Sequence, residues 1–127
     1  MFNKEKKYTD NLGKTNRIVE GTKIQGNIES VADFRLDGQL IGNFTSKGKL
    51  VLGPAGVITG DVNCKNADVE GTITGKILIQ ELLTIKTTAK ISGEVKTAKL
   101  SVEPGATFNA TCAMGNPTNF KSEEKKQ

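Results

Sequence analysis

Histidine and tryptophan are both absent from this sequence of 127 residues. Without histidine, a Ser-His-Asp or Cys-His catalytic arrangement and a histidine-ligated metal site are excluded. The chain also lacks a GxxxxGK[ST] loop, so nucleotide hydrolysis is not expected. Its two cysteines, Cys64 and Cys112, form no CxxC motif and are interpreted as reduced, packed thiols. The sequence therefore predicts a protein that is not an enzyme and carries no metal or cofactor.

Long hydrophobic runs are missing as well. No stretch approaches the roughly 20 apolar residues that a membrane-spanning helix needs. The start Met1-Phe2-Asn3-Lys4 leads into charged residues and not into the apolar region of a signal peptide. The expected compartment is the cytoplasm. Because aromatic residues are few, the core of this single domain is expected to consist mainly of Ile, Leu and Val.

The formal net charge of +4 lies outside the middle of the chain. Residues 1–17 carry five basic and two acidic groups, and residues 116–127 carry three and two. Residues 18–115 carry ten of each, so this segment is neutral. It has no continuous basic stripe that would follow a phosphate backbone, and nucleic-acid binding by it is not expected.

What the chain does have is a repeated pentad of the form apolar-x-small-x-apolar. It occurs six times at a spacing of 15 to 18 residues, beginning at Ile24, Leu40, Ile58, Ile73, Ile91 and Phe108. The small residue at the third position is glycine in the first five pentads and Ala110 in the last. A repeat this regular indicates a stack of similar units, each burying its apolar face only against its neighbours.

Apolar and polar residues alternate around each pentad, which is the period of a β-strand. One repeat has a contour of about 50 to 60 Å, which fits a closed coil of three short strands with tight corners. Successive coils are expected to pair in parallel, giving an all-β triangular solenoid of about six coils. The pentad glycines are expected at corners that leave no room for a side chain and need a positive φ. Pro54 and Pro104 fall at equivalent corners, where their missing N–H is tolerated.

Stacking the coils in register predicts three inward-facing ladders as the complete core. The first ladder comprises Ile24, Leu40, Ile58, Ile73, Ile91 and Phe108. The second comprises Ile28, Phe44, Val62, Ile77, Val95 and Cys112. The third comprises Leu36, Leu52, Val69, Ile85 and Val102.

The strings Glu20-Gly-Thr-Lys-Ile-Gln-Gly-Asn-Ile28, Leu36-Asp-Gly-Gln-Leu-Ile-Gly-Asn-Phe44 and Pro104-Gly-Ala-Thr-Phe108 resemble a bactofilin. The resemblance covers residues 18–115, with Ala110 as a departure from the glycine that the family commonly has. It implies a right-handed parallel β-helix that polymerises end to end, without nucleotide, into non-polar filaments. It further implies a location on the inner face of the cytoplasmic membrane and a scaffold role in cell shape or cell-wall synthesis. Proteins of cell-wall synthesis or hydrolysis are then expected partners, besides further copies of the chain.

Residues 1–17 and 116–127 are polar and are expected to be disordered tails. Within the first tail, segment 1–8 is predicted to bind anionic lipid of the inner membrane. Phe2 would enter the headgroup region while nearby lysines meet the lipid charge, and the predicted membrane-binding residues are Met1, Phe2, Lys4, Lys6 and Lys7. Similar starts target the membrane in some bactofilins, which supports this interpretation by resemblance.

The two ends of the solenoid are the predicted polymerisation surfaces, because neither flank offers an obvious cap for the open strand edges. The interface residues are predicted to be Ile18, Val19, Ile24, Ile28, Val102, Phe108, Cys112 and Met114. Phe108 matches the phenylalanine in the final coil of bactofilins, where it lies at a polymerisation interface. Ordinary core packing of Phe108 is compatible with the same role.

Two other functions fit a parallel β-helix. One is a binding module that displays side chains along its faces and does not polymerise. The other is a hexapeptide-repeat acyltransferase, which is disfavoured because the six-residue period and the catalytic histidine of such enzymes are missing here.

Overall fold

The computed structural model describes residues 15–115, which form strands and no helix. The strands are β1 (Thr15–Ile18), β2 (Lys23–Gln25), β3 (Ile28–Ser30), β4 (Asp33–Leu36), β5 (Gln39–Ile41), β6 (Phe44–Ser46), β7 (Lys49–Leu52), β8 (Val57–Thr59), β9 (Val62–Val69), β10 (Thr72–Ile85), β11 (Lys90–Val102) and β12 (Thr107–Met114). Strand β1 begins ahead of the expected core boundary at residue 18. The predicted disorder of residues 1–14 and 116–127 concerns positions outside the described residues.

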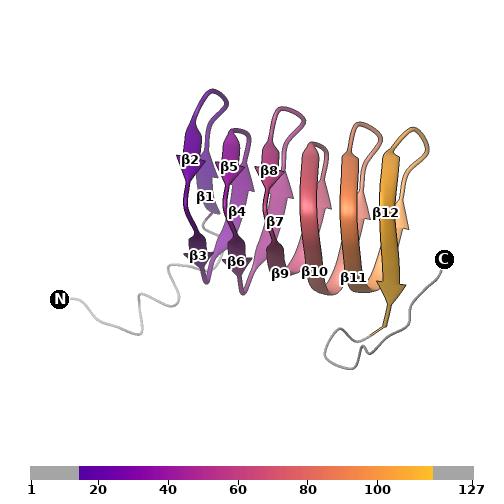
Figure 1. The fold of residues 1–127 in the computed structure, drawn as a ribbon. Coiled ribbons are helices and arrows are strands. Elements are labelled where there is room, and N and C mark those ends of the chain that lie inside the picture. The colour runs from indigo at the N-terminus through magenta and orange to yellow at the C-terminus, as the bar shows by residue number, and fades with distance from the viewer. Residues whose placement is uncertain (1–14, 116–127) are drawn as a thin grey trace.

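All strand pairs are parallel, and each links one coil to the next. Figure 1 shows the coils following one another from the N-terminal to the C-terminal end of a rod. In the first coils, three separate short strands form the three walls. From β9 onward single strands run through a corner, so that β10 pairs with both β8 and β9. The predicted parallel solenoid of about six coils is confirmed.

The strand register confirms the three predicted ladders. In the first ladder, Ile24 pairs with Leu40, and the chain of partners continues to Ile91 and Phe108. The second ladder runs from Ile28 to Cys112 in the same way. The third also includes Ile18, which pairs with Leu36. Members of the ladders between the two end coils expose at most 2 % of their surface, so they form the core.

The core is larger than predicted, because two further ladders face inward. One comprises Phe34, Leu50, Ala67, Leu83 and Leu100. Phe34 packs edge to face against Phe44, with ring centroids 5.1 Å apart. This ladder arises because the pattern apolar-x-apolar before each turn places both apolar residues inward. The prediction that three ladders complete the core was therefore wrong.

The other additional ladder lies at a corner and mixes polar with apolar side chains. It comprises Ser30, Ser46, Cys64, Ile79, Thr97 and Met114. The buried Ser46 hydroxyl donates to the Ala32 carbonyl and accepts from the Gly48 N–H, both at 3.0 Å. The buried Thr97 hydroxyl donates to the Lys99 carbonyl at 2.9 Å. These side chains bind the backbone of the corner, so their burial leaves no polar group without a partner.

The pentad glycines lie at corners with positive φ, as predicted. Gly60 has a φ of +147°, and a Cβ atom added there would collide with the carbonyl oxygen of Gly42 in the preceding coil. The same collision recurs up the stack, between Gly75 and Gly60 and between Gly93 and Gly75. Glycine is thus required by the close stacking of the coils as well as by the corner conformation.

At a second corner of the solenoid, successive coils differ in the length of their turn, which is long in some coils and short in others. Long turns at 19–22, 53–56, 86–89 and 103–106 are each closed by a hydrogen bond from the last N–H to the first carbonyl. The intervening coils turn more tightly at 36–39 and 69–72. The long turns project beyond the short ones at the top of Figure 1. Pro54 and Pro104 lie in long turns, as predicted, and coils five and six both have the long form.

Several outward polar residues also join the coils. The side-chain oxygen of Asn43 accepts the Asp61 N–H at 3.1 Å, and that of Asp61 accepts the Lys76 N–H at 3.3 Å. An ion pair of 3.0 Å links Lys49 to Asp68. These outward side chains therefore stabilise the stacking of neighbouring coils as well as facing solvent.

Candidate functional site

At the N-terminal end of the rod, three ladders terminate in the first coil. Ile18, Ile24 and Ile28 are half-buried, whereas their partners Leu36, Leu40 and Phe44 are fully buried. Within residues 15–115, the first coil has a neighbouring coil on one side only, whereas these partners are covered on both sides. The structure thus brings together three of the four residues predicted for this surface.

Val19, the fourth, lies elsewhere. It exposes 61 % of its surface in the long turn 19–22 and lines a groove on the side of the rod with Arg17 and Asp37. The alternation of the strand ends at Ile18, so the inward-outward pattern does not extend to Val19. The sequence predicted this residue for the end surface because it belongs to the first coil.

At the C-terminal end, the ladders terminate in the last coil. Val102 exposes 46 % and Met114 48 % of their surface, although both occupy inward positions of their ladders. Phe108 and Cys112 are half-buried and pack against the core. All four predicted residues therefore lie together on this end. Leu100 also belongs here, and its alternation with Val102 was the signal that could have identified it.

The strand edges at both ends are open among the described residues. Strands β1, β2 and β3 pair only with β4, β5 and β6, and β12 pairs only with β11. In the first coil, a Cβ atom added at Gly26 would meet nothing within 4 Å, unlike the glycines stacked behind it. An open edge with unpaired N–H and carbonyl groups is a template for pairing with another chain. Each end combines such an edge with exposed apolar side chains.

The two cysteine thiols do not provide an activated nucleophile at either end of the rod. Burial raises the pKa of the Cys64 thiol to about 12, and burial also raises the pKa of Cys112. A catalytic thiol needs a lowered pKa, so neither thiol is activated as a nucleophile. Both are free, as predicted, and the Cys112 sulfur lies 3.8 Å from the sulfur of Met114.

Other features bear on the site. Between residues 15 and 115 no His, Cys, Asp and Glu side chains gather in a group that could hold a metal ion. In the same range no helix is long and apolar enough to cross a membrane. The predicted membrane-binding residues Met1, Phe2, Lys4, Lys6 and Lys7 lie outside the described residues. The arrangement of the described part supports association through its ends.

Solved structures share this fold. The chain matches a Thermus thermophilus bactofilin, reconstructed by cryo-EM as double helical filaments, with a TM-score of 0.76 and 26 % identity. That match covers 79 % of this chain and 99 % of the other. The bactofilin BacA, solved by solid-state NMR, matches with a TM-score of 0.72 and 21 % identity over 79 % of this chain and 95 % of BacA. The likeness to BacA shows the fold alone.

Curated relatives come from Myxococcus xanthus (strain DK1622). Bactofilin BacO is 26 % identical over 91 residues, which is 72 % of each chain. Bactofilin BacP is 27 % identical over 93 residues, which is 73 % of this chain but 39 % of BacP. The family model for bactofilins, described as polymer-forming cytoskeletal, matches residues 16–113. The chain therefore belongs to the bactofilin family of polymer-forming cytoskeletal proteins.

Proposed function

We propose that this protein assembles end to end, without nucleotide, into non-polar filaments on the inner face of the cytoplasmic membrane. There it organises the machinery of cell shape or of the cell wall, as a scaffold and not as an enzyme. The observation that carries this proposal is the exposure of inward ladder positions at both ends of the rod. Val102 and Met114 are exposed because no further coil follows them within residues 15–115.

The apolar side chains at the two ends support an assembly in which identical ends meet. If the last coil meets the last coil of another copy, Phe108, Val102 and Met114 bury one another. The first coil is then left to meet a first coil in the same way. Alternating contacts of this isologous kind give a filament without polarity. The filaments of the Thermus thermophilus relative show that self-association occurs in the family.

The substitution Phe108→Arg tests assembly. It places a charge in the proposed contact, which we expect to leave a folded, β-rich protein that sediments as small species. Circular dichroism checks the fold, and sedimentation with negative-stain electron microscopy checks assembly. The matched control is Asn109→Arg, an exposed and outward neighbour on the same strand, which should still form filaments. Filaments of the Phe108→Arg variant would refute the assignment of the interface.

The membrane contact is proposed for segment 1–8. Each lysine near an anionic surface contributes about 1 kcal/mol, which is weak for one copy. A filament presents the segment many times, and avidity then gives stable attachment. Co-sedimentation with anionic liposomes should fall strongly when residues 1–8 are deleted. Equal pelleting of the full chain and the deletion variant would rule out this anchor.

A further inference from the structure

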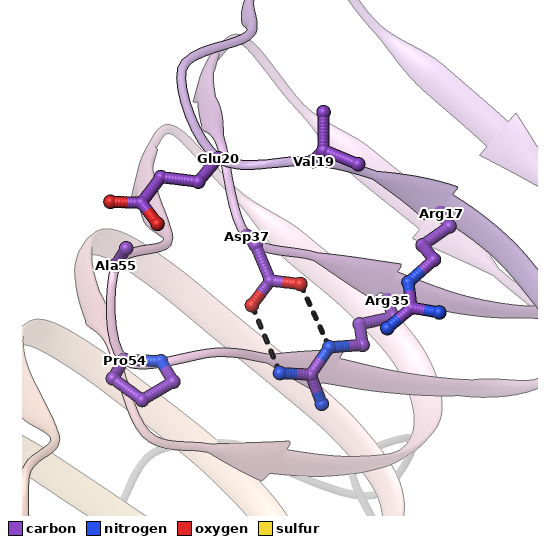
Figure 2. Close-up of a pocket in the computed structure, with 7 residues that line it drawn as sticks. All are labelled: Arg17, Val19, Glu20, Arg35, Asp37, Pro54 and Ala55. Carbon is purple, nitrogen blue, oxygen red and sulfur yellow. Dashed lines mark hydrogen bonds and ion pairs between the residues drawn. The ribbon is translucent and has the colours of Figure 1, made fainter.

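The alternation of long and short turns creates a groove on the side of the rod. Its rims are the long turns of the first and third coils, which contribute Val19 and Glu20 on one side and Pro54 and Ala55 on the other. The short turn of the second coil lies lower between them. The pocket has a volume of about 500 Å³, and Figure 2 shows the residues that line it. We call this pocket the corner groove.

The floor of the corner groove carries a fixed ion pair. Arg35 donates from Nε to Asp37 Oδ2 at 2.8 Å and from Nη2 to Asp37 Oδ1 at 3.0 Å. Gly53 of the next coil holds the pair from one side, since a Cβ atom there would collide with the Asp37 carboxylate and lie 3.0 Å from Arg35 Nη2. A guanidinium has five N–H donors. The Arg35 donors that Asp37 does not use remain available to a ligand.

A second guanidinium lies beside the first. Arg17 pairs in register with Arg35, and Figure 2 shows the two side chains next to each other, with Glu20 on the far side of Asp37. Within residues 15–115, neither Arg17 nor Glu20 forms an ion pair. Asp37 thus pairs with Arg35, and no described carboxylate pairs with Arg17. Arg17, Arg35 and Asp37 together carry one positive charge in excess, Glu70 also acts electrostatically on Arg35, and Glu20 on the opposite rim carries one negative charge.

We propose that the corner groove binds an extended acidic segment of a partner protein. A carboxylate of the segment lies between Arg17 and Arg35, where two guanidinium groups offer paired N–H donors. Small apolar side chains next to the carboxylate pack on Val19, Pro54 and Ala55. Strand β4 beneath the groove is paired on both sides, with β1 and β7. Recognition therefore depends on side chains and not on addition of a strand.

The shape and charge of the groove favour a peptide over a membrane. The groove lies beside two long turns that project from the rod, so a flat lipid surface meets these turns first. Glu20 on the rim repels anionic headgroups, whereas a peptide can place its acidic residue away from Glu20. All the lining residues come from positions 17–55 of one copy. The site is thus complete within one copy, without assembly.

Equilibrium dialysis of the full chain with fluorescent hexapeptides tests the proposal. In these probes Glu alternates with Val, Pro or Ala, and the matched peptides carry Gln in place of Glu. We expect the Glu peptides to bind and the Gln peptides not to bind. The substitution Arg17→Gln should weaken binding about tenfold, because it removes a charge-assisted contact. Glu20→Gln should strengthen binding, since it removes a repulsive charge.

The control variant is Lys90→Gln, which removes an exposed cation on a different wall and coil. It should bind the peptides like the unmodified chain. Equal losses for Arg17→Gln and Lys90→Gln would overturn the proposal in favour of general electrostatic attraction. Absence of binding by every Glu peptide would also overturn it. If Arg17→Gln instead weakened binding only to phosphatidylglycerol vesicles, the surface would be a lipid contact and not a peptide site.

Discussion

The first and last coils differ in how firmly they are attached to the rod. The first coil joins its neighbour through strands of three or four residues, separated by corners. In the last coil, β12 pairs with Lys90–Thr97 of β11 without a break. Glu103 adds further bonds to the preceding turn, accepting the Thr87 N–H and hydroxyl at 3.2 Å. The last coil is therefore joined to its neighbour by a longer uninterrupted ladder than the first coil.

The two coils are alike in chemistry despite this difference. Each ends the same ladders with half-buried or exposed apolar side chains, and each leaves its strand edges open. Assembly should thus use both ends, but with unequal strength. The last coil offers the long edge of β12 to another chain, whereas the first coil offers the three short edges of β1, β2 and β3.

The largest expected effect is on the oligomeric state of variants that carry an arginine at one end of the rod or at both. Ile24 and Phe108 are the first and last members of one ladder, and each can be replaced by arginine. If like ends meet, each single variant should stop at a dimer joined through its intact end, and the double variant should be monomeric. Light scattering after size-exclusion chromatography measures the masses. Monomers from both single variants would instead indicate that the first coil binds the last.

Thiol labelling compares the last coil with the middle of the rod. Cys64 is 1 % exposed, and burial raises its pKa to about 12, whereas Cys112 is half-buried at the end. At pH 8 Cys112 should react with a maleimide roughly a hundredfold faster than Cys64, since reaction requires an accessible thiolate. Both rates should rise with pH as thiolate forms. Filament formation should protect Cys112, and unchanged labelling on assembly would contradict burial of this end.

Substitutions of the stacked pentad glycines compare the first coil with an inner coil. Gly26 and Gly60 share a positive φ, but only at Gly60 would a Cβ atom collide with another coil. Alanine costs strain at both positions, and Gly60→Ala should lose about 2 kcal/mol more in free energy of unfolding than Gly26→Ala. Denaturant unfolding in the monomeric double-arginine background measures this. Equal losses would mean that the backbone conformation, and not stacking, requires the glycines.

The smallest expected effect concerns the long turns of the two end coils. Glu103→Gln should lower the free energy of unfolding by about 0.5 to 1 kcal/mol, because its contacts with Thr87 and Lys86 are exposed to solvent. Glu20→Gln in the first coil is the matched change and should have almost no effect, since Glu20 forms no ion pair with residues 15–115. Thermal unfolding of both variants provides the measurement. A similar loss of stability in the Glu20→Gln variant would mean that Glu20 makes a stabilising contact in the first coil, and would contradict the expected difference.

The sequence predicted those parts of the molecule that follow from its repeat. Ile58 and Ile73 fall in one ladder because equivalent pentad positions must stack, and Gly60 marks a corner for the same reason. Ser46 and Thr97 were missed because inward polar residues break the apolar pattern and are satisfied only by the local fold of a corner. Val19 lines the groove on the side of the rod because the alternation of β1 ends at Ile18 and a turn follows.

The corner groove could not be predicted from any single repeat. It depends on the lengths of three successive turns and on the position of Gly53 against the Arg35–Asp37 pair. Arg17 and Arg35 become neighbours only when the register of β1 and β4 is known. The corner groove is thus determined by contacts between coils, and the residue pattern within one coil does not reveal it.

The alternation of long and short turns also determines how such a rod can be lengthened. Gly71 lies directly against the long turn of the preceding coil, since a Cβ atom there would collide with the carbonyl oxygens of Gly53 and Gly56. A short-turn coil is therefore fitted to a long-turn neighbour. Duplication of residues 33–65 would insert one short and one long coil and preserve every junction, adding about 10 Å of length. Such a duplication preserves the alternation of turns in this part of the rod, and it would lengthen the spacing along a filament while both end surfaces stay the same.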